Sequence, residues 1–289
     1  MFASLAAWCL LAVVPVSVTP QTAPAPDKGQ SPAWLKTLSP LEPGTFPPPR
    51  PFEAAYRLTW SDVEAGRAEV RCAPGADGDT IRTTVKTATR GAARLLYKMD
   101  GLGVALADRR TLRPVQFDQK EDRGSKRNVA KVVFAPEGAT RTLLQTDKDG
   151  KPLPRPDAAK DARPKRFDYP GLVDIHGTLL QLRSQTLAAG EERVYAVMSA
   201  TSPYLAKVKV VGRGKVKVRA GEYPAIECAL SLQKINKRGE LENYKSLKQA
   251  RAWLSDDADR ILLKVETQIF IGSVNMELES VKFAPGGGR

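Results

Sequence analysis

The stretch ILLKVETQIFIGSVNMELES, residues 261–280, alternates apolar and polar side chains on both sides of Gly272. Between Ile261 and Ile271 every second side chain is apolar or a threonine, while Lys264 points the other way. A period of two with one apolar face is typical of a strand in a sheet that is buried on one side and wet on the other. The stretch therefore predicts two antiparallel strands joined by a tight turn.

The same alternation recurs along most of the chain, and turn residues separate the alternating runs at intervals of about 8–12 residues. This spacing is typical of an antiparallel meander. The expected strands span residues 54–60, 67–72, 80–88, 95–97, 104–108, 115–119, 128–134, 140–145, 193–199, 206–211, 215–219, 225–232 and 250–254. Residues 237–240 are expected to form a hairpin tip.

Residues 171–188 break this pattern, because Leu172, Ile175, Leu179 and Leu182 recur at helical spacing. A single apolar helix among strands has to bury its face against a sheet. We therefore predict a mainly β fold with a large curved antiparallel sheet or half-open barrel wrapped around one helix. The apolar face of residues 261–271 would receive either that helix or a ligand in its place.

The composition allows a sizeable core and favours anionic partners. The chain has 289 residues, 42% of them hydrophobic, and a formal net charge of +13. A strongly basic protein attracts anionic molecules. Phospholipid or lipopolysaccharide head groups, acidic polysaccharide and nucleic acid are the candidates, and the predicted export disfavours nucleic acid.

The N-terminus resembles a secretory leader. The first 19 residues carry no charged side chain, and residues 5–18 are almost wholly apolar. This run is shorter than the about 20 residues of a membrane-spanning helix and suits a signal peptide. We predict a signal peptide over residues 1–20 and an exported, periplasmic protein without a transmembrane helix in its mature chain. Trp8 precedes Cys9, where a lipoprotein would carry a small residue, so a lipid anchor is not expected. A buried N-terminal helix is the alternative.

Residues 21–51 are rich in proline and are expected to form an extended linker. Alternatively, Trp34, Leu35 and Leu38 dock on the domain as a short helical turn. One β domain is expected over residues 52–284, followed by a disordered tail over residues 285–289. Within the domain, residues 147–170 resemble a long surface loop.

Two cysteines remain after removal of the leader, and both lie in expected strands. In an oxidising compartment Cys72 and Cys228 could form a disulfide. Cysteines this far apart in sequence are also often independent buried thiols. Both interpretations stay open, because a bridge requires Cα atoms within about 7 Å of each other.

Several short motifs together resemble the DUF3108 family of exported bacterial proteins of unknown function. They are RAGEYPAIE at residues 219–227, AWLSDDADR at residues 252–260, YRLTW at residues 56–60, and Leu182–Arg183 on the expected helix. The resemblance spans roughly residues 52–283 and implies an exported, mostly antiparallel β protein. It carries over no catalytic residues. This chain departs from the pattern at residues 174–177, which do not favour a helix.

No motif of a catalytic, metal or cofactor site is present in the sequence, so we expect no cofactor. His176 is the only histidine, whereas a zinc site needs several His or Cys ligands and a catalytic triad needs supporting residues. Asp256, Asp257 and Asp259 lack the spacing of a calcium loop. They are expected to accept hydrogen bonds from nearby backbone amides in a polar turn.

A basic hairpin is the strongest candidate for a binding surface. A turn is expected at residues 212–214, and like charges facing each other across its two strands would be unfavourable unless an anion neutralised them. The candidate anionic-ligand face consists of Lys207, Lys209, Arg213, Lys215, Lys217 and Arg219. The alternative is a solvated lysine row that protects a sheet edge from aggregation.

Three hypotheses of function follow. The preferred one is an exported, non-enzymatic protein that binds or carries a lipid or another amphiphilic anionic ligand in the hollow of its sheet. The second is a structural or assembly role in the cell envelope, with the proline-rich arm and the basic face as partner contacts. An envelope hydrolase is the least favoured. The sequence does not determine the oligomeric state.

Overall fold

The computed structural model describes residues 31–152, 163–243, 249–268 and 272–284. Within these ranges the strands form one 16-stranded sheet. All pairings are antiparallel apart from a short parallel one between β9 and β10. The strands of the first half are β1 (Phe52–Trp60), β2 (Val63–Pro74), β3 (Thr80–Thr89), β4 (Met99–Asp108), β5 (Pro114–Arg123), β6 (Lys126–Ala135), β7 (Gly138–Asp147) and β8 (Lys165–Phe167). Those of the second half are β9 (Leu172–Val173), β10 (Glu192–Met198), β11 (Pro203–Val218), β12 (Gly221–Ile235), β13 (Leu241–Asn243), β14 (Gln249–Ser255), β15 (Leu262–Gln268) and β16 (Ser273–Phe283).

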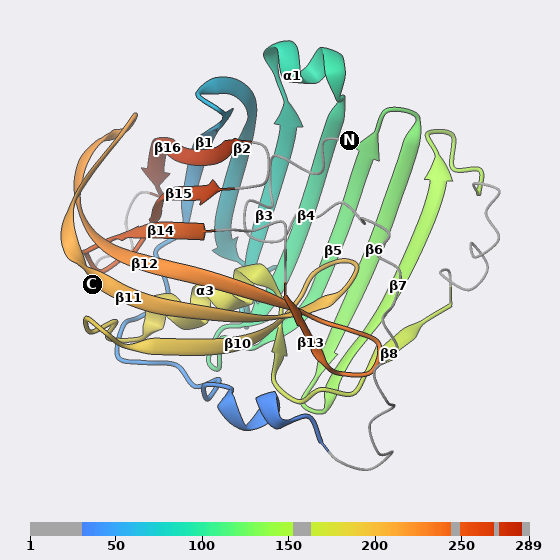
Figure 1. Ribbon diagram of the computed structural model, residues 1–289, viewed down its shortest axis with the longest axis horizontal. Helices are drawn as coiled ribbons and strands as arrows, with labels where there is room; N and C mark the ends of the chain where they lie inside the picture. Colours follow the sequence, from blue (N-terminus) through green and yellow to red (C-terminus); the bar gives the residue numbers. More distant parts are fainter. Residues whose placement is uncertain (1–30, 153–162, 244–248, 269–271, 285–289) are drawn as a thin grey trace.

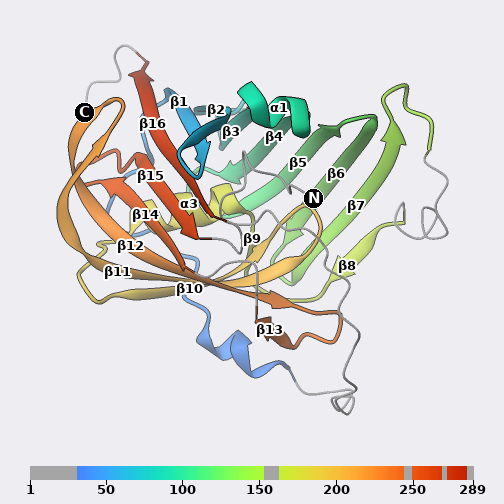
Figure 2. The same cartoon turned by 45° about the horizontal axis from the view of Figure 1, so that its top comes forward.

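The two halves join where the first strand of the sheet pairs with the last. β1 and β16 run antiparallel, from Phe52 opposite Phe283 to Trp60 opposite Val274. The sheet order is therefore β8 to β1 and then β16 back to β9. This long sheet curls, and α3 (Ile175–Ser184) lies in its hollow (Figures 1 and 2). The predicted class, a curved antiparallel sheet around one helix, is confirmed.

The two closing strands form as their alternation predicts. Ile261, Leu263 and Val265 are almost fully buried, and Thr267 on the same face is buried as well. Residues 269–271, which were expected to continue this face, lie outside the described residues, as do the predicted signal peptide and tail. β12 and β13 also form the predicted hairpin, whose tip lies at residues 236–240.

The helix is shorter than expected because an N-cap and a strand take over its first residues. Leu172 and Val173 pair with β10 as β9. The Asp174 carboxylate then accepts hydrogen bonds from the backbone amides of His176 at 2.8 Å and Gly177 at 3.0 Å. This cap satisfies amides that have no partner within the helix, so a stretch of low helix propensity still begins α3.

One expected strand is wrong. Residues 95–97 do not form a strand, because Gly91–Leu96 form the short helix α1 between β3 and β4. Gly91 begins it with φ of 55°, a value that glycine adopts readily. The following alanines, arginine and leucines are all good helix formers. Local propensity therefore prevails over the apolar run that had suggested a strand.

The proline-rich segment docks on the domain over the part that the structure describes. Ala33–Thr37 form the 3₁₀ turn η1, and Trp34 in it is only 6% exposed. The Trp34 indole donates to the carbonyl of Gly239 at 2.8 Å. Farther on, the amide of Ser39 donates to the carbonyl of Val194 at 2.9 Å. For residues 31–51 the docked alternative is therefore the one observed.

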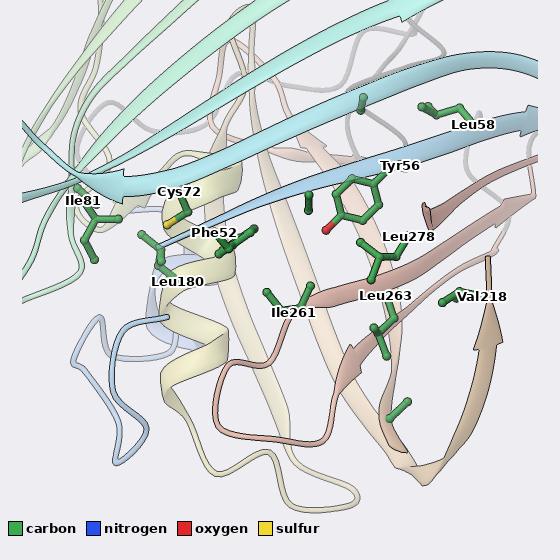
Figure 3. Close-up of a cluster of buried hydrophobic side chains, with 14 of the residues drawn as sticks. Phe52, Tyr56, Leu58, Cys72, Ile81, Leu180, Val218, Ile261, Leu263 and Leu278 are labelled. Atoms are coloured by element: carbon green, nitrogen blue, oxygen red, sulfur yellow. The ribbon is translucent and has the colours of Figure 1, made fainter. Parts of the chain in front are cut away.

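Three groups of buried side chains make up the core. The largest joins β1, β2, β15 and β16 to the middle of α3 through Leu180 (Figure 3). A second contains Phe117 and Trp34, and a third contains Leu182 and the inner residues of β10–β12. Because Leu180 and Leu182 belong to different groups, α3 connects opposite walls of the curled sheet.

Candidate functional site

A cavity of about 150 Å³ lies beside α3 in the hollow of the sheet. Leu179 and Leu182 of the helix line it, Phe52 and Val70 form one wall, and Val208 contributes to the other. The remaining lining comes from β3, β12 and β14–β16 and is mostly apolar. The hollow therefore holds both the helix and an apolar space next to it. The sequence had left open whether the helix or a ligand in its place would lie there.

Small side chains explain why the helix does not fill the hollow. Ala68, Cys72 and Thr83 lie on the side of β2 and β3, and Ala252 lies on β14. Protein interiors otherwise pack as densely as organic crystals. Small residues opposite a helix therefore leave a space that larger ones would occupy.

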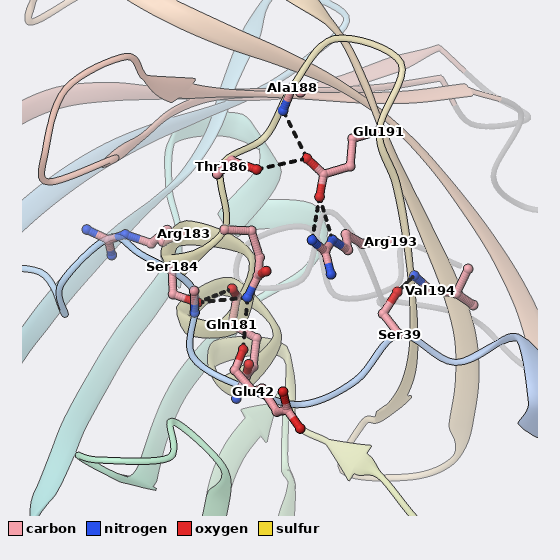
Figure 4. Close-up of polar contacts among 12 residues, drawn as sticks. Ser39, Glu42, Gln181, Arg183, Ser184, Thr186, Ala188, Glu191, Arg193 and Val194 are labelled. Carbon is pink, nitrogen blue, oxygen red and sulfur yellow. Dashed lines mark hydrogen bonds and ion pairs between the residues drawn. The ribbon is translucent and has the colours of Figure 1, made fainter.

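Arg183 brings a positive charge into this lining. Its side chain projects from the last turn of α3 and is only 5% exposed. Nε donates to the carbonyl of Asp259 at 3.1 Å, and Nη2 donates to the same oxygen. The guanidinium also lies 5.5 Å from the centre of the Phe52 ring. No carboxylate in the described ranges lies within ion-pair distance of it, although Asp259, which pairs with Arg50, and Asp257 act on its charge from farther away. Figure 4 shows Arg183 directed away from the polar contacts around Ser184 and Glu191.

Arg183 is the only charged group of the lining near pH 7. Burial raises the pKa of Tyr56 far above its usual value, and the Tyr56 hydroxyl donates to the carbonyl of Leu262 at 2.9 Å. Burial likewise raises the pKa of Cys72, and that of Cys228 to about 11. Burial lowers the pKa of His176 to about 4. These groups are all neutral near pH 7, whereas an arginine stays protonated although burial lowers its pKa.

A second buried arginine fixes the end of the helix. Arg260 is 2% exposed, and its Nη1 donates to the carbonyls of Arg183, at 3.1 Å, and of Gln185. Its Nη2 donates to the carbonyl of Thr186 at 3.2 Å. The guanidinium also stacks 3.4 Å from the centre of the Phe46 ring. Arg260 therefore binds one carbonyl of the last turn of α3 and the carbonyls of the two residues that follow the helix.

The acidic turn before Arg260 is a structural turn in the described chain. Asp257 accepts hydrogen bonds from the amides of Asp259, at 2.9 Å, and of Arg260, at 2.8 Å. Asp259 pairs with Arg50 at 2.6 Å, and Asp256 pairs with Arg213 at 3.1 Å. Over the described ranges no group of His, Cys, Asp and Glu side chains is placed to hold a metal ion. The hydrogen bonds from backbone amides to Asp257 are those expected for a polar turn.

His176 is a buried residue beside the N-cap of α3. Its ring lies 5.9 Å from that of Phe117, and it also contributes to the cavity lining. Asp174 is 1% exposed, and burial raises its pKa to about 6 despite the two amides that it accepts from. The two neighbouring groups therefore have pKa values displaced in opposite directions.

The structure divides the predicted basic face. β11 runs unbroken from Pro203 to Val218, so the turn expected at residues 212–214 is wrong. Its place is taken by a β-bulge between Val210 and Gly212, as glycines within a strand often indicate. The hairpin turn instead follows β11, at Arg219 and Ala220.

This bulge places the basic residues on opposite faces of the β11–β12 ribbon. Before it, the buried Val208 and Val210 share the inner face with Leu230 and Cys228, so Lys207 and Lys209 point outward. After it, the pairing shifts by one residue, and the exposed Arg213, Lys215 and Lys217 share a face with Ile226, Pro224 and Glu222. The expected row of like charges facing each other across a hairpin is therefore wrong. Lys209 instead faces Glu192, and Lys215 pairs with Glu222 at 3.1 Å.

None of these basic residues lines the cavity. Sequence reasoning named the outer lysines and missed Arg183 as a charged group of the interior. A signal was nevertheless present, because Arg183 lies four residues after Leu179 and next to Leu182, on the apolar side of the expected helix.

The structure brings the two predicted disulfide partners to one cavity. Cys72 and Cys228 both line it, from β2 and β12, and both are buried free thiols. A disulfide between them stays a prediction. The raised pKa values of both thiols disfavour the thiolate, which is the reactive form.

Comparisons with known proteins agree with this architecture. The profile of the family described as "Protein of unknown function (DUF3108)" matches residues 55–279. No curated protein sequence matches the chain. None of the helices in the described ranges is long and apolar enough to cross a membrane.

Solved structures with the same fold include a β-barrel-like protein of the DUF1849 domain family from Brucella abortus. It has 10% sequence identity and a TM-score of 0.55, and the match covers 83% of this chain and 100% of that one. A protein from Bacteroides fragilis, described as exported with a YmcC-like fold, has 9% identity and a TM-score of 0.34 over 83% of this chain and 99% of that one. A protein from Parabacteroides distasonis, described as a lipoprotein, has 6% identity and a TM-score of 0.32 over the same shares. The first of these establishes the likeness of fold.

Proposed function

This chain belongs to the DUF3108 family of proteins of unknown function, and we propose that it is an exported envelope protein that binds an anionic amphiphile. The apolar part of the ligand occupies the cavity beside α3, and its anionic group binds Arg183. The other ionisable groups of the lining stay neutral.

The buried charge of Arg183 is the observation that carries this proposal. A buried cation without a carboxylate partner is unfavourable, because the protein replaces only part of its hydration. The carbonyl of Asp259 supplies one acceptor, and Arg183 Nη1 makes no hydrogen bond to the described residues. A carboxylate or phosphate would form short charge-assisted hydrogen bonds there.

The volume of the cavity sets the size of the apolar group. A dry apolar cavity of about 150 Å³ accepts a molecule the size of benzene, whereas typical small-molecule sites have about 300–1,000 Å³. A short acyl chain or a single ring therefore fits the cavity of about 150 Å³. A whole phospholipid does not fit unless α3 moves.

Two features of the sequence support the assignment to the envelope. The uncharged, apolar residues at the N-terminus suit a signal peptide. The net charge of +13 suits a protein that works among anionic molecules. We therefore include export to the periplasm in the proposed function.

A matched pair of ligands tests the role of Arg183. Hexanoate and hexanol carry the same chain and differ in charge, and calorimetric titration measures the affinity of each. We expect the unmodified protein to bind hexanoate at least tenfold more tightly than hexanol, since only hexanoate neutralises the buried cation. Arg183→Met should abolish this preference.

Lys209→Met is the matched control, because Lys209 is exposed on the outer face of the wall that contains Val208. It should leave both affinities unchanged. Equal binding of the two ligands by the unmodified protein would refute an anion site in the cavity. A loss of hexanoate binding in Lys209→Met alone would instead assign the site to the outer basic residues.

The helix in the hollow favours a second candidate, a structural or assembly role in the envelope. In that case α3 serves as an internal brace, which Arg260 holds at its C-terminal end. Ala252→Leu separates the two functions, since it places a larger side chain in the cavity lining. If the protein binds a ligand in the cavity, the variant should lose affinity for hexanoate. If the role is structural, cells that carry the variant should keep the envelope integrity of cells that carry the unmodified protein.

A further inference from the structure

The short helix α1 presents two leucines to solvent at one end of the sheet. Leu95 is 91% exposed and Leu96 is 72% exposed. α1 stands at the ends of β3 and β4, at the top of Figure 1. The start of β2 lies beside it, because the amide of Arg90 donates to the carbonyl of Ala65 at 2.9 Å. The first residue of β2, Val63, is 59% exposed. We call these three apolar residues the apolar tip.

A row of half-exposed apolar side chains crosses the outer face of the neighbouring strands. Leu102, Val129 and Leu144 are 39%, 38% and 45% exposed, respectively. The strand register places Leu102 beside Lys120, Lys120 beside Val129, and Val129 beside Leu144. Directly paired residues point to the same side of a sheet. These four residues, here called the outer row, therefore share one face.

The outer row lies on the side of the sheet that faces away from the core. The alternate residues of the same strands, Ala105, Phe117, Ala130 and Leu143, are all buried in the core. On the adjoining strand, Lys86 pairs with Leu102 and extends the row with another exposed lysine. Two lysines thus alternate with apolar side chains across the outer face of β3–β6, and only Val129 and Leu144 of the outer row are directly paired apolar neighbours.

Basic residues also surround the apolar tip. Arg90, Lys98 and Lys126 are exposed, and none of them forms an ion pair with the described residues. The turn between β5 and β6 lies next to Lys98, because the amide of Gly124 donates to the Lys98 carbonyl at 3.0 Å.

Two of the nearby acidic residues are paired with arginines, whereas Asp62 next to Val63 is exposed and forms no ion pair with the described residues. Asp100 pairs with Arg94 at 2.8 Å, and Asp122 pairs with Arg127 at 2.7 Å. The charge that remains free on this edge of the sheet is therefore mostly positive.

We propose that the apolar tip and the outer row form a docking surface for an anionic lipid bilayer. The leucines of α1 enter the acyl region, while the surrounding Arg90, Lys98 and Lys126 meet the phosphate groups of the lipids. Leucine beside lysine and arginine is the composition by which interfacial segments bind anionic membranes. This surface is separate from the cavity and does not depend on what the cavity binds.

A bilayer suits this surface better than a protein partner does. A stable protein interface buries about 800 Å² on each partner and has an apolar centre with few charges. Here three apolar side chains project from a tip, and on the outer face Lys120 separates Leu102 from the pair Val129 and Leu144. Such spacing gives no continuous apolar centre, whereas a fluid bilayer adapts to separate side chains.

Vesicle co-sedimentation tests the proposal, using the chain as recovered after export so that the apolar N-terminus is absent. Vesicles of pure phosphatidylcholine are compared with vesicles that contain phosphatidylglycerol as the anionic lipid. We expect at least tenfold stronger partitioning onto the anionic vesicles, and we expect this partitioning to weaken as salt is added. The double variant Leu95→Ser/Leu96→Ser should lower it at least fivefold. These leucines are exposed, so the variant should fold normally, which circular dichroism verifies.

Val211→Ser is the matched control, because Val211 is 51% exposed on β11 and lies outside both groups of residues. It should partition like the unmodified protein. Equal partitioning onto neutral and anionic vesicles would overturn the proposal, as would equal partitioning of the leucine double variant. A dimer in solution that the double variant dissociates would also overturn it, by showing that a second copy of the chain covers the leucines.

Discussion

Arg183 and Arg260 lie at the same end of α3 and are both buried, but different groups satisfy them. Arg260 uses both terminal nitrogens to bind carbonyls of residues 183, 185 and 186, and it stacks on Phe46. Arg183 gives Nε and one terminal nitrogen to a single carbonyl, that of Asp259, and borders an apolar cavity. Each arginine leaves one nitrogen without a hydrogen bond to the described residues, Nε in Arg260 and Nη1 in Arg183, but Arg260 has three carbonyl acceptors and Arg183 has one.

This difference separates a structural arginine from a binding one. Charged hydrogen bonds to the last carbonyls of a helix stabilise that helix, so Arg260 serves the fold. A buried cation beside an apolar space serves a ligand better than it serves stability. Residues that look alike in sequence and in burial can therefore be distinguished by counting the acceptors that each one has.

The largest effect is expected from Arg260→Met. The variant would remove the donors to the carbonyls of residues 183, 185 and 186, and we expect the free energy of unfolding to fall by about 3–5 kcal/mol. Urea denaturation followed by circular dichroism measures it. Arg251→Met is the control, because Arg251 forms an exposed ion pair with Glu227, which is worth about 0–1 kcal/mol. An equal loss of unfolding free energy in the two variants would show that Arg260 has no special structural role.

A pH titration tests whether Arg183 is the only cation of the lining. The pKa of His176 is lowered to about 4, so the stability that neutral His176 provides is complete above pH 6.5 and is lost as the pH falls towards 4. The pKa of Asp174 is raised to about 6, so the stability that protonated Asp174 provides is complete below pH 3.8 and is lost as the pH rises through 6. Each contribution amounts to about 3 kcal/mol at most, and the two oppose each other.

Two variants separate these contributions. His176→Gln keeps only the Asp174 contribution, so its stability should fall as the pH rises from 4 to 6. Asp174→Asn retains an N-cap residue and keeps only the His176 contribution, so its stability should rise over the same range. Denaturation midpoints measured across this range check both slopes. Equal slopes in the two variants would show that the pKa values of His176 and Asp174 are not displaced in opposite directions, and the neutrality of His176 throughout this pH range would then be lost.

Arg183→Met should have a small effect on stability. The lost hydrogen bonds to the Asp259 carbonyl are offset by removal of a buried charge, so the free energy of unfolding should change by no more than about 1 kcal/mol. Urea denaturation in the absence of ligand measures this change. A loss as large as that of Arg260→Met would make Arg183 a second structural clamp.

The smallest effect is expected from Lys209→Ser on the outer face. Lys209 is exposed and forms no ion pair with the described residues, so stability should change by less than about 0.5 kcal/mol. Thermal unfolding provides the measurement. An increase in stability of more than this would show that the basic residues of β11 are under strain, which would favour an anion site on the outer face.

Much of the fold could be predicted because a buried sheet face imposes its period on the sequence. The face from Ile261 to Thr267 and the helix around Leu179 both followed from that spacing. The helical turn at Trp34 was open as an alternative because a tryptophan in a proline-rich segment tends to bury its ring.

The expected elements were wrong where local backbone geometry prevails over the alternation of apolar and polar residues. Residues 95–97 looked like a strand, but good helix formers behind Gly91 made α1. Gly212 looked like a turn, but the neighbouring strands extended the pairing past it and left a bulge. The role of Arg183 depends on the carbonyl of Asp259, which is 76 residues away in sequence. No spacing within the helix could have revealed that contact.

The most direct test of the central claim is a crystal structure with bound 6-bromohexanoate, in which anomalous scattering locates the bromine. We predict the bromine in the cavity beside Leu179 and Val208, and the carboxylate within about 3 Å of Arg183. Bromine located only along Lys207 and Lys209 on the outer face, or an empty cavity at saturating ligand, would contradict the account.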